Sequence, residues 1–251
     1  MTLEVLKWIR SKRIFILLFI CSFSGIISPL IAYYSDSLIK NLSGNSSAKI
    51  ILPEPTWESV MGSYFKNIEQ LILFIVVFLV AQACIIGKNE SLQLFYKTRS
   101  NKASFIYTPK VVVSIIIATS GIIFGDLCAT YMDWALFGNK LKYSNLFSAF
   151  GLHLLVFLMF VLLGATISIW MSSPFLSACI VEIIVLISGA LVGTKFYDKW
   201  LPSALLSPTK YLNGIIRFES IWRIILFILA VILICFFAIQ MKPIRKTIKR
   251  K

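Results

Sequence analysis

Few residues in this sequence could carry out enzymatic chemistry, and they are widely separated. There is one histidine, His153, and there are five cysteines, none of them in a CxxC pair. No HExxH motif occurs, and no serine stands in a GxSG setting. Hydrolases and metalloenzymes need a nucleophile, a base or several metal ligands at suitable spacing. We therefore expect neither a catalytic residue nor a metal site, and the pattern argues against an enzyme.

The stretch GALVGTK, residues 189–195, is the nearest approach to a nucleotide-binding loop. It lacks the GxxxxGK[ST] spacing, and it ends an apolar run instead of joining a strand to a helix. We therefore expect no nucleotide-binding domain within residues 1–251.

Several ionisable residues lie inside long apolar runs, where an ionised side chain costs about 2.5–3.5 kcal/mol near the bilayer centre. We expect Asp133, near the end of its run, to lie at the membrane interface. Two interpretations of Glu182 stay open. Its carboxyl is either protonated, or bonded to a serine or threonine of a neighbouring helix, or it marks a substrate path or a seam between subunits. The candidates for such a path or seam are Glu182, Asp126 and His153.

The elements that carry these residues are predicted to be membrane-spanning helices. Hydrophobic residues make up 58% of the chain and charged residues only 14%, whereas soluble domains have about 25% charged residues. A helix needs about 20 residues to cross roughly 30 Å of hydrocarbon. We predict an all-α integral membrane protein with a single domain over residues 1–251 and six transmembrane helices, at residues 14–34, 69–86, 111–134, 146–170, 175–194 and 221–241.

The distribution of lysine and arginine predicts the orientation in the membrane. With the N-terminus inside, the predicted cytoplasmic segments carry 15 of these residues and the predicted outer loops carry 9. Cytoplasmic loops have the excess of basic residues, so both termini are expected in the cytoplasm. The basic residues lie between apolar runs and not on one globular face, which excludes a nucleic-acid-binding domain. We expect a multi-pass protein of a bacterial plasma membrane.

Two predicted outer loops contain helical patterns of their own. LPEPTWESVMGSYFKNI, residues 52–68, is expected to form a short interfacial helix before the second span. The loop at residues 195–220 is too apolar for a solvated linker. We expect short helices there that dip back into the bundle, broken by Pro202 and Pro208.

The basic segment GKNESLQLFYKTRSNKASFIYTPK, residues 87–110, is long for a connection between adjacent spans, which usually needs about 2–8 residues. It also holds two apolar patches, SLQLFYK and ASFIY. This combination predicts a cytoplasmic surface that docks on a partner. The alternative is a basic amphipathic helix lying on anionic lipid headgroups.

Taken together, these features resemble the permease subunit of type-2 ATP-binding-cassette exporters. The similar features are an amphipathic TLEVLKWIRSKR before the first span, the basic segment 87–110, the tight turn MSSP after the fourth span and WLPSALLSP after the fifth. The resemblance implies an N-terminal elbow helix with Leu3, Leu6 and Ile9 on one side. It also implies a coupling helix between spans two and three that docks on the ATPase, with candidate residues Glu90, Leu92, Leu94, Phe95, Lys97, Arg99 and Lys102.

The resemblance further implies the partners and the activity. Two ATP-binding subunits would hold ATP and Mg²⁺, with no cofactor in this chain, and a second permease subunit, identical or homologous, would complete the path through the bilayer. The implied activity is export of a hydrophobic or amphipathic peptide, drug or lipid. The alternative is an integral-membrane binding or immunity protein that works without an ATPase and intercepts a toxin or antimicrobial peptide.

Overall fold

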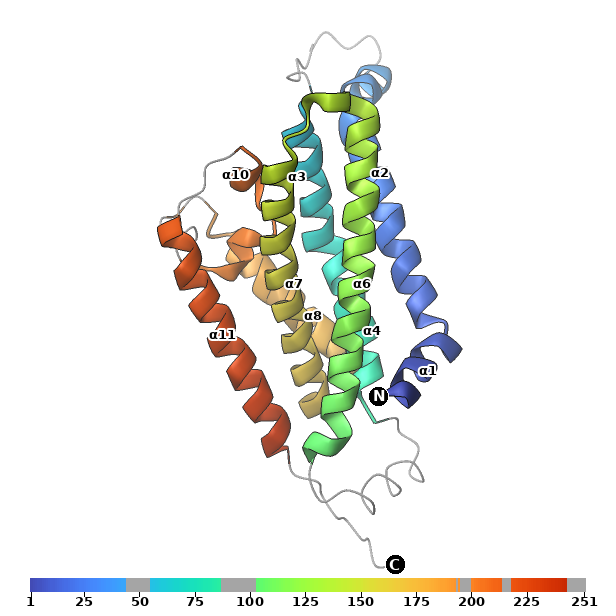
Figure 1. Cartoon of the computed structure of the whole chain (residues 1–251), viewed down its shortest axis with the longest axis vertical. Helices are drawn as coiled ribbons and strands as arrows, with labels where there is room; N and C mark the ends of the chain where they lie inside the picture. Colours follow the sequence, from blue (N-terminus) through green and yellow to red (C-terminus); the bar gives the residue numbers. More distant parts are fainter. Residues whose placement is uncertain (44–54, 87–102, 193, 195–199, 214–217, 243–251) are drawn as a thin grey trace, which may run out of the picture.

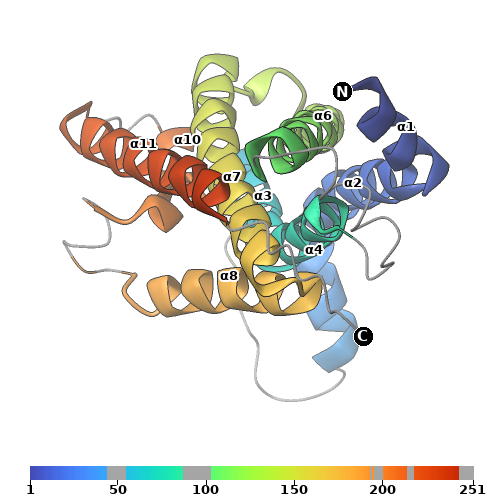
Figure 2. The ribbon, with the colours of Figure 1, turned by 90° about the horizontal axis from the view of Figure 1, so that it is seen from below.

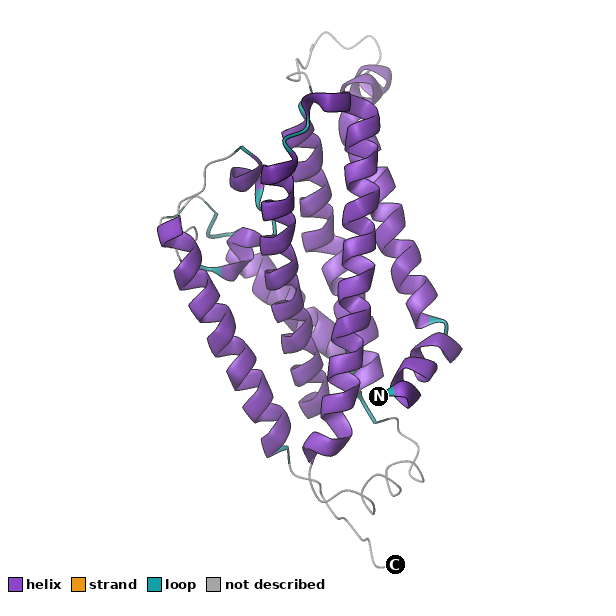
Figure 3. Ribbon diagram, in the orientation of Figure 1, coloured by secondary structure: helices purple, strands orange, loops and turns teal. Residues whose placement is uncertain are grey.

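The computed structural model of the protein describes residues 1–43, 55–86, 103–192, 194, 200–213 and 218–242. Regular structure in these residues is entirely helical (Figure 3). Five helical segments are long and apolar enough to cross a membrane: Arg13–Ser35, Trp57–Cys84, Ala103–Phe137, Tyr143–Met171 and Ile224–Met241. The prediction of an all-α, multi-pass membrane protein is confirmed at this level.

The long helices run along a common axis (Figure 1). They are α2 (Arg13–Ser43), α6 (Ala103–Phe137), α7 (Tyr143–Met171) and α11 (Phe218–Met241). The N-terminal helix α1 and the last residues of α11 lie at the same end of the bundle (Figure 1). We call the opposite end the far end; it is the end that the basic-residue distribution predicts to be outside.

The second predicted span begins earlier than expected. Helix α3 (Trp57–Asn67), the π-helix η1 (Ile68–Ile72) and helix α4 (Leu73–Cys84) follow one another without a break. Together they form one 28-residue apolar segment. The predicted helix before the second span is therefore present, but it continues into that span without a break, and its interfacial position stays a prediction. The apolar side chains of α3 are buried in the bundle, and a capping box between Thr56 and Ser59 starts the helix.

The fifth predicted span is shorter than expected. Helix α8 (Pro174–Gly189) has 16 residues, or about 24 Å at 1.5 Å per residue, below the roughly 30 Å of a hydrocarbon core. It leaves α7 through the predicted tight turn, in which Ser172 has a φ of 55°. Figure 2 shows α8 extending sideways from the bundle. Of the six predicted spans, five are thus matched by helices of spanning length.

The N-terminal amphipathic helix is present as α1 (Thr2–Arg10), which packs against α2 and α6. Trp8 anchors it, with only 3% of its surface exposed, whereas Leu3, Leu6 and Ile9 are 72%, 45% and 43% exposed. The predicted apolar side therefore faces away from the protein, where lipid would cover it. Trp8, which the helical pattern did not single out, makes the contact with the bundle.

Among the described residues between α8 and α11 are two short helices, as the sequence predicts. They are η3 (Pro202–Leu205) and α10 (Thr209–Leu212). Both pack against α7, and α10 also contacts α3 (Figure 1). Pro202 is the first residue of η3, where its missing N–H costs nothing, and Pro208 is the N-cap residue just before α10. These helices place residues 201–212 over the far half of α7.

Candidate functional site

The predicted ATPase-docking residues Glu90, Leu92, Leu94, Phe95, Lys97, Arg99 and Lys102 lie outside the described residues. The end of the basic segment is described, and it differs from the prediction. Residues 103–110 are the first turns of α6 and not part of a loop. Ala103, Ile106 and Tyr107 of the apolar patch ASFIY are buried in the bundle of their own chain, whereas Phe105 is 75% exposed.

Asp126 lies in the interior between α6 and α3. The phenol of Tyr64 donates a 2.9 Å hydrogen bond to Asp126 Oδ1, and both side chains are buried. Tyr64 belongs to the stretch that the sequence placed in an interfacial helix, so this partner could not be assigned in advance. Through this hydrogen bond, Asp126 links α6 to α3.

Asp133 lies two turns further along α6 and is completely buried. Neither of its carboxylate oxygens has a hydrogen-bond partner. The helix α3 packs against α6. Asp133 lies four residues before the end of α6 at Phe137, and its expected position at the membrane interface stays a prediction.

His153 of α7 is fully buried and holds the backbone of residue 206. Its Nδ1 lies 2.7 Å from the carbonyl oxygen of Leu206. A carbonyl oxygen only accepts hydrogen bonds, so Nδ1 carries the proton and Nε2 is left as an acceptor. Nε2 has no hydrogen-bond partner. The ring centroids of Phe65 and Phe157 lie 5.0 Å and 5.8 Å from the centroid of the imidazole, so these two rings pack against it.

Glu69, which the sequence analysis placed at the start of the second span, contacts the same short segment. The hydroxyl of Ser207 donates a 2.5 Å hydrogen bond to Glu69 Oε2. Glu69 lies in the π-helix η1, and such an insertion changes which side of the helix the following residues face and is frequent at functional sites. A charged residue at the edge of an apolar run was the signal that could have pointed to this contact.

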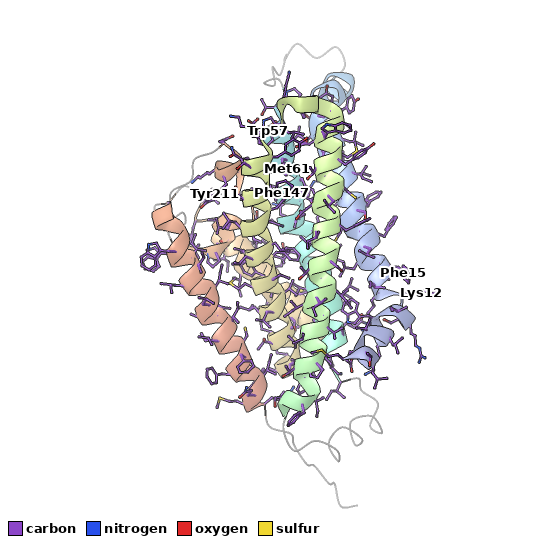
Figure 4. All side chains as sticks on the ribbon, viewed as in Figure 1. Lys12, Phe15, Trp57, Met61, Phe147 and Tyr211 are labelled. Atoms are coloured by element: carbon purple, nitrogen blue, oxygen red, sulfur yellow. The ribbon has the colours of Figure 1, made fainter. Side chains whose placement is uncertain are left out.

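Asn145 of α7 makes the third contact, since its Nδ2 donates a 3.2 Å hydrogen bond to the carbonyl oxygen of Leu212. Three side chains from η1 and α7 thus hold residues 206, 207 and 212. Figure 4 labels the buried Tyr211 of this segment at the far end of the molecule, together with Trp57 and Met61 of α3.

Glu182 of α8 is half-buried, and its Oε2 is buried without a hydrogen-bond partner. No serine or threonine bonds to that oxygen, so the predicted hydrogen bond to a neighbouring helix is not seen there. Asp126 bonds to Tyr64 and His153 to Leu206, whereas Glu182 Oε2 has no partner, so no hydrogen bond joins the three residues. His153 and Glu69 instead contact neighbouring residues of one segment, Leu206 and Ser207.

The described residues hold no group of three or more histidine, cysteine, aspartate or glutamate side chains that could bind a metal ion. The five cysteines are free, and three of them are buried.

The chain matches no protein-family model, no curated protein and no solved structure. The candidate site is the group Glu69, Asn145 and His153 together with the segment that they hold.

Proposed function

We propose that the chain is the permease subunit of an ATP-driven exporter and forms a path for a hydrophobic or amphipathic substrate. One observation supports this function best. In the far half of the bundle, the buried His153 and the half-buried Glu69 and Asn145 lie beneath a segment of short broken helices. Such irregular backbone within a membrane protein occurs where it packs on protein or lines a wet cavity, and buried polar groups there commonly belong to substrate pathways.

In this proposal the energy comes from a separate ATPase. Two ATP-binding subunits would dock on the basic segment of residues 87–110 in each of two permease subunits. ATP binding would favour one of two packed arrangements of the helices, because ligands shift populations only through different affinities for the two states. The sequence features of the segment, its length, basic charge and SLQLF patch, are what support this docking role.

Copurification tests the proposal directly. The chain would be extracted from its native membrane in mild detergent, and nucleotide hydrolysis would be measured on the purified fraction. We expect a stoichiometric ATP-binding subunit, which is lost when Leu92, Leu94 and Phe95 are all replaced by glutamate. The matched control replaces Thr98, Ser100 and Asn101 by glutamate, because it adds the same charge to the same segment and keeps the apolar patch.

A chain that purifies without a partner and without hydrolysis, in detergent that preserves other membrane complexes, would contradict the proposal. The alternative of an ATPase-independent binding or immunity protein would then be favoured. Loss of the partner in the control as well would show that charge, and not the apolar patch, governs docking.

A further inference from the structure

The segment of residues 201–212, which we call the strap, makes polar contacts with three side chains of the bundle. Glu69 accepts from Ser207, His153 donates to Leu206, and Asn145 donates to Leu212. All three anchoring side chains belong to η1 or α7. To these three contacts the strap contributes the hydroxyl of Ser207 and the backbone carbonyls of Leu206 and Leu212.

The strap has little secondary structure of its own that could hold its conformation away from the bundle. Its internal backbone bonds are short-range, such as Leu206 N to Ser203 O at 3.0 Å and Tyr211 N to Pro208 O at 3.0 Å. Pro202 and Pro208 have no N–H to donate. Its position therefore depends on side chains inserted into the bundle, and Leu205, Leu206 and Leu212 are buried.

The closed position leaves two polar groups unsatisfied. Ser203 Oγ, in the strap, is buried without a hydrogen-bond partner, and so is Nε2 of His153 beneath it. Buried polar groups are normally paired, and an unpaired one lowers the stability of the arrangement that buries it. Opening the strap would expose both groups to water, where they could form hydrogen bonds. The free-energy difference that favours the closed position is therefore smaller than the burial of apolar side chains alone would give.

We propose that the strap is a closing device for the far end of the bundle, latched by Glu69 and His153, which lifts from α7 as a unit. Its role as the outer gate of an export path rests on the proposed function. The latch itself does not rest on the proposed function, because every contact in it lies within this one chain.

The latch is tested by thiol labelling of the full-length chain in membranes, without any ATPase. Ser203→Cys introduces a buried thiol into the strap with little change in shape, and labelling by a membrane-impermeant maleimide is measured against the parent chain. Labelling should be slow. Removing an anchor with Glu69→Leu or His153→Phe should raise the rate at least about fivefold, since each anchor stabilises the closed position by a charge-assisted or buried hydrogen bond.

Two controls separate opening of the strap from general loosening. Gln70→Leu changes the exposed neighbour of Glu69 and should leave the rate unchanged. Ser114→Cys, buried in α6, should stay unlabelled in the anchor variants. If it is labelled, the anchor variants have loosened the whole bundle, and Ser207→Ala then decides, because it removes the same hydrogen bond from the strap side and leaves the bundle intact.

Unchanged labelling of Ser203→Cys in Glu69→Leu, His153→Phe and Ser207→Ala would overturn the latch. This result is independent of ATPase copurification. If the anchor variants raise labelling but no ATPase copurifies, the latch is supported and the exporter is rejected. If an ATPase copurifies but the anchor variants leave labelling unchanged, the exporter is supported and the latch is rejected.

Discussion

The phenol of Tyr64 donates a 2.9 Å hydrogen bond to the carboxylate of Asp126, and this bond joins two helices across 62 residues of sequence. Both residues are buried. The bond and the burial of both partners show that α3 packs in the bundle against α6. It also gives Asp126 a structural reason for its place in an apolar helix.

Replacing Tyr64 by phenylalanine should destabilise the protein by about 1–3 kcal/mol, because it leaves the buried carboxylate of Asp126 without this donor. The free energy of unfolding in detergent micelles, from chemical denaturation, measures the loss. Tyr131→Phe is the matched control, since Tyr131 is 62% exposed on the same helix as Asp126. Equal effects of the two changes would show that the bond contributes nothing to stability.

The close approach of α2 and α6 should depend on Gly25. A Cβ built there would lie 2.4 Å from the carbonyl oxygen of Gly125, which is backbone and cannot rotate away. Gly25→Ala should therefore force the helices apart and lower the free energy of unfolding by about 1–3 kcal/mol.

Gly151→Ala is the control for this change, since nothing lies within 4 Å of a Cβ built at Gly151. There the substitution should be neutral or stabilising, because alanine is favoured over glycine in a helix by about 1 kcal/mol. Melting temperatures of the two variants, measured side by side, provide the comparison. A Gly25 variant as stable as the Gly151 variant would contradict the tight packing.

The short helix α8 should still bring the chain across the membrane, with the turn of residues 190–192 completing the path. We expect a membrane-impermeant thiol reagent applied to intact cells to label Asn213→Cys and not Ser172→Cys, because the excess of basic residues holds the termini and the α7–α8 turn inside. Both positions are exposed in the structure. Labelling of both, or of neither, would mean that α8 re-enters on the side from which it came.

The membrane class and most of the spans could be predicted from composition and run length. The bounds of α7 and α11 agree with the predicted fourth and sixth spans to within a few residues, because uninterrupted apolar runs are recognisable without tertiary information. The second and fifth spans were predicted less well. Around Tyr64 the apolar residues alternate with polar ones, and such a pattern is equally compatible with the membrane surface and with a buried, polar-lined interface.

The sequence by itself determined that this chain is helical, embedded in a membrane and without a recognisable catalytic motif, because these properties depend on local composition and spacing. The tertiary structure decided which polar residues meet. Glu69 reaches Ser207 across 138 residues of sequence, and His153 reaches Leu206 across 53. Contacts over such distances depend on how helices pack and on a π-helical turn at residues 68–72, and neither leaves a periodic signal in a single sequence.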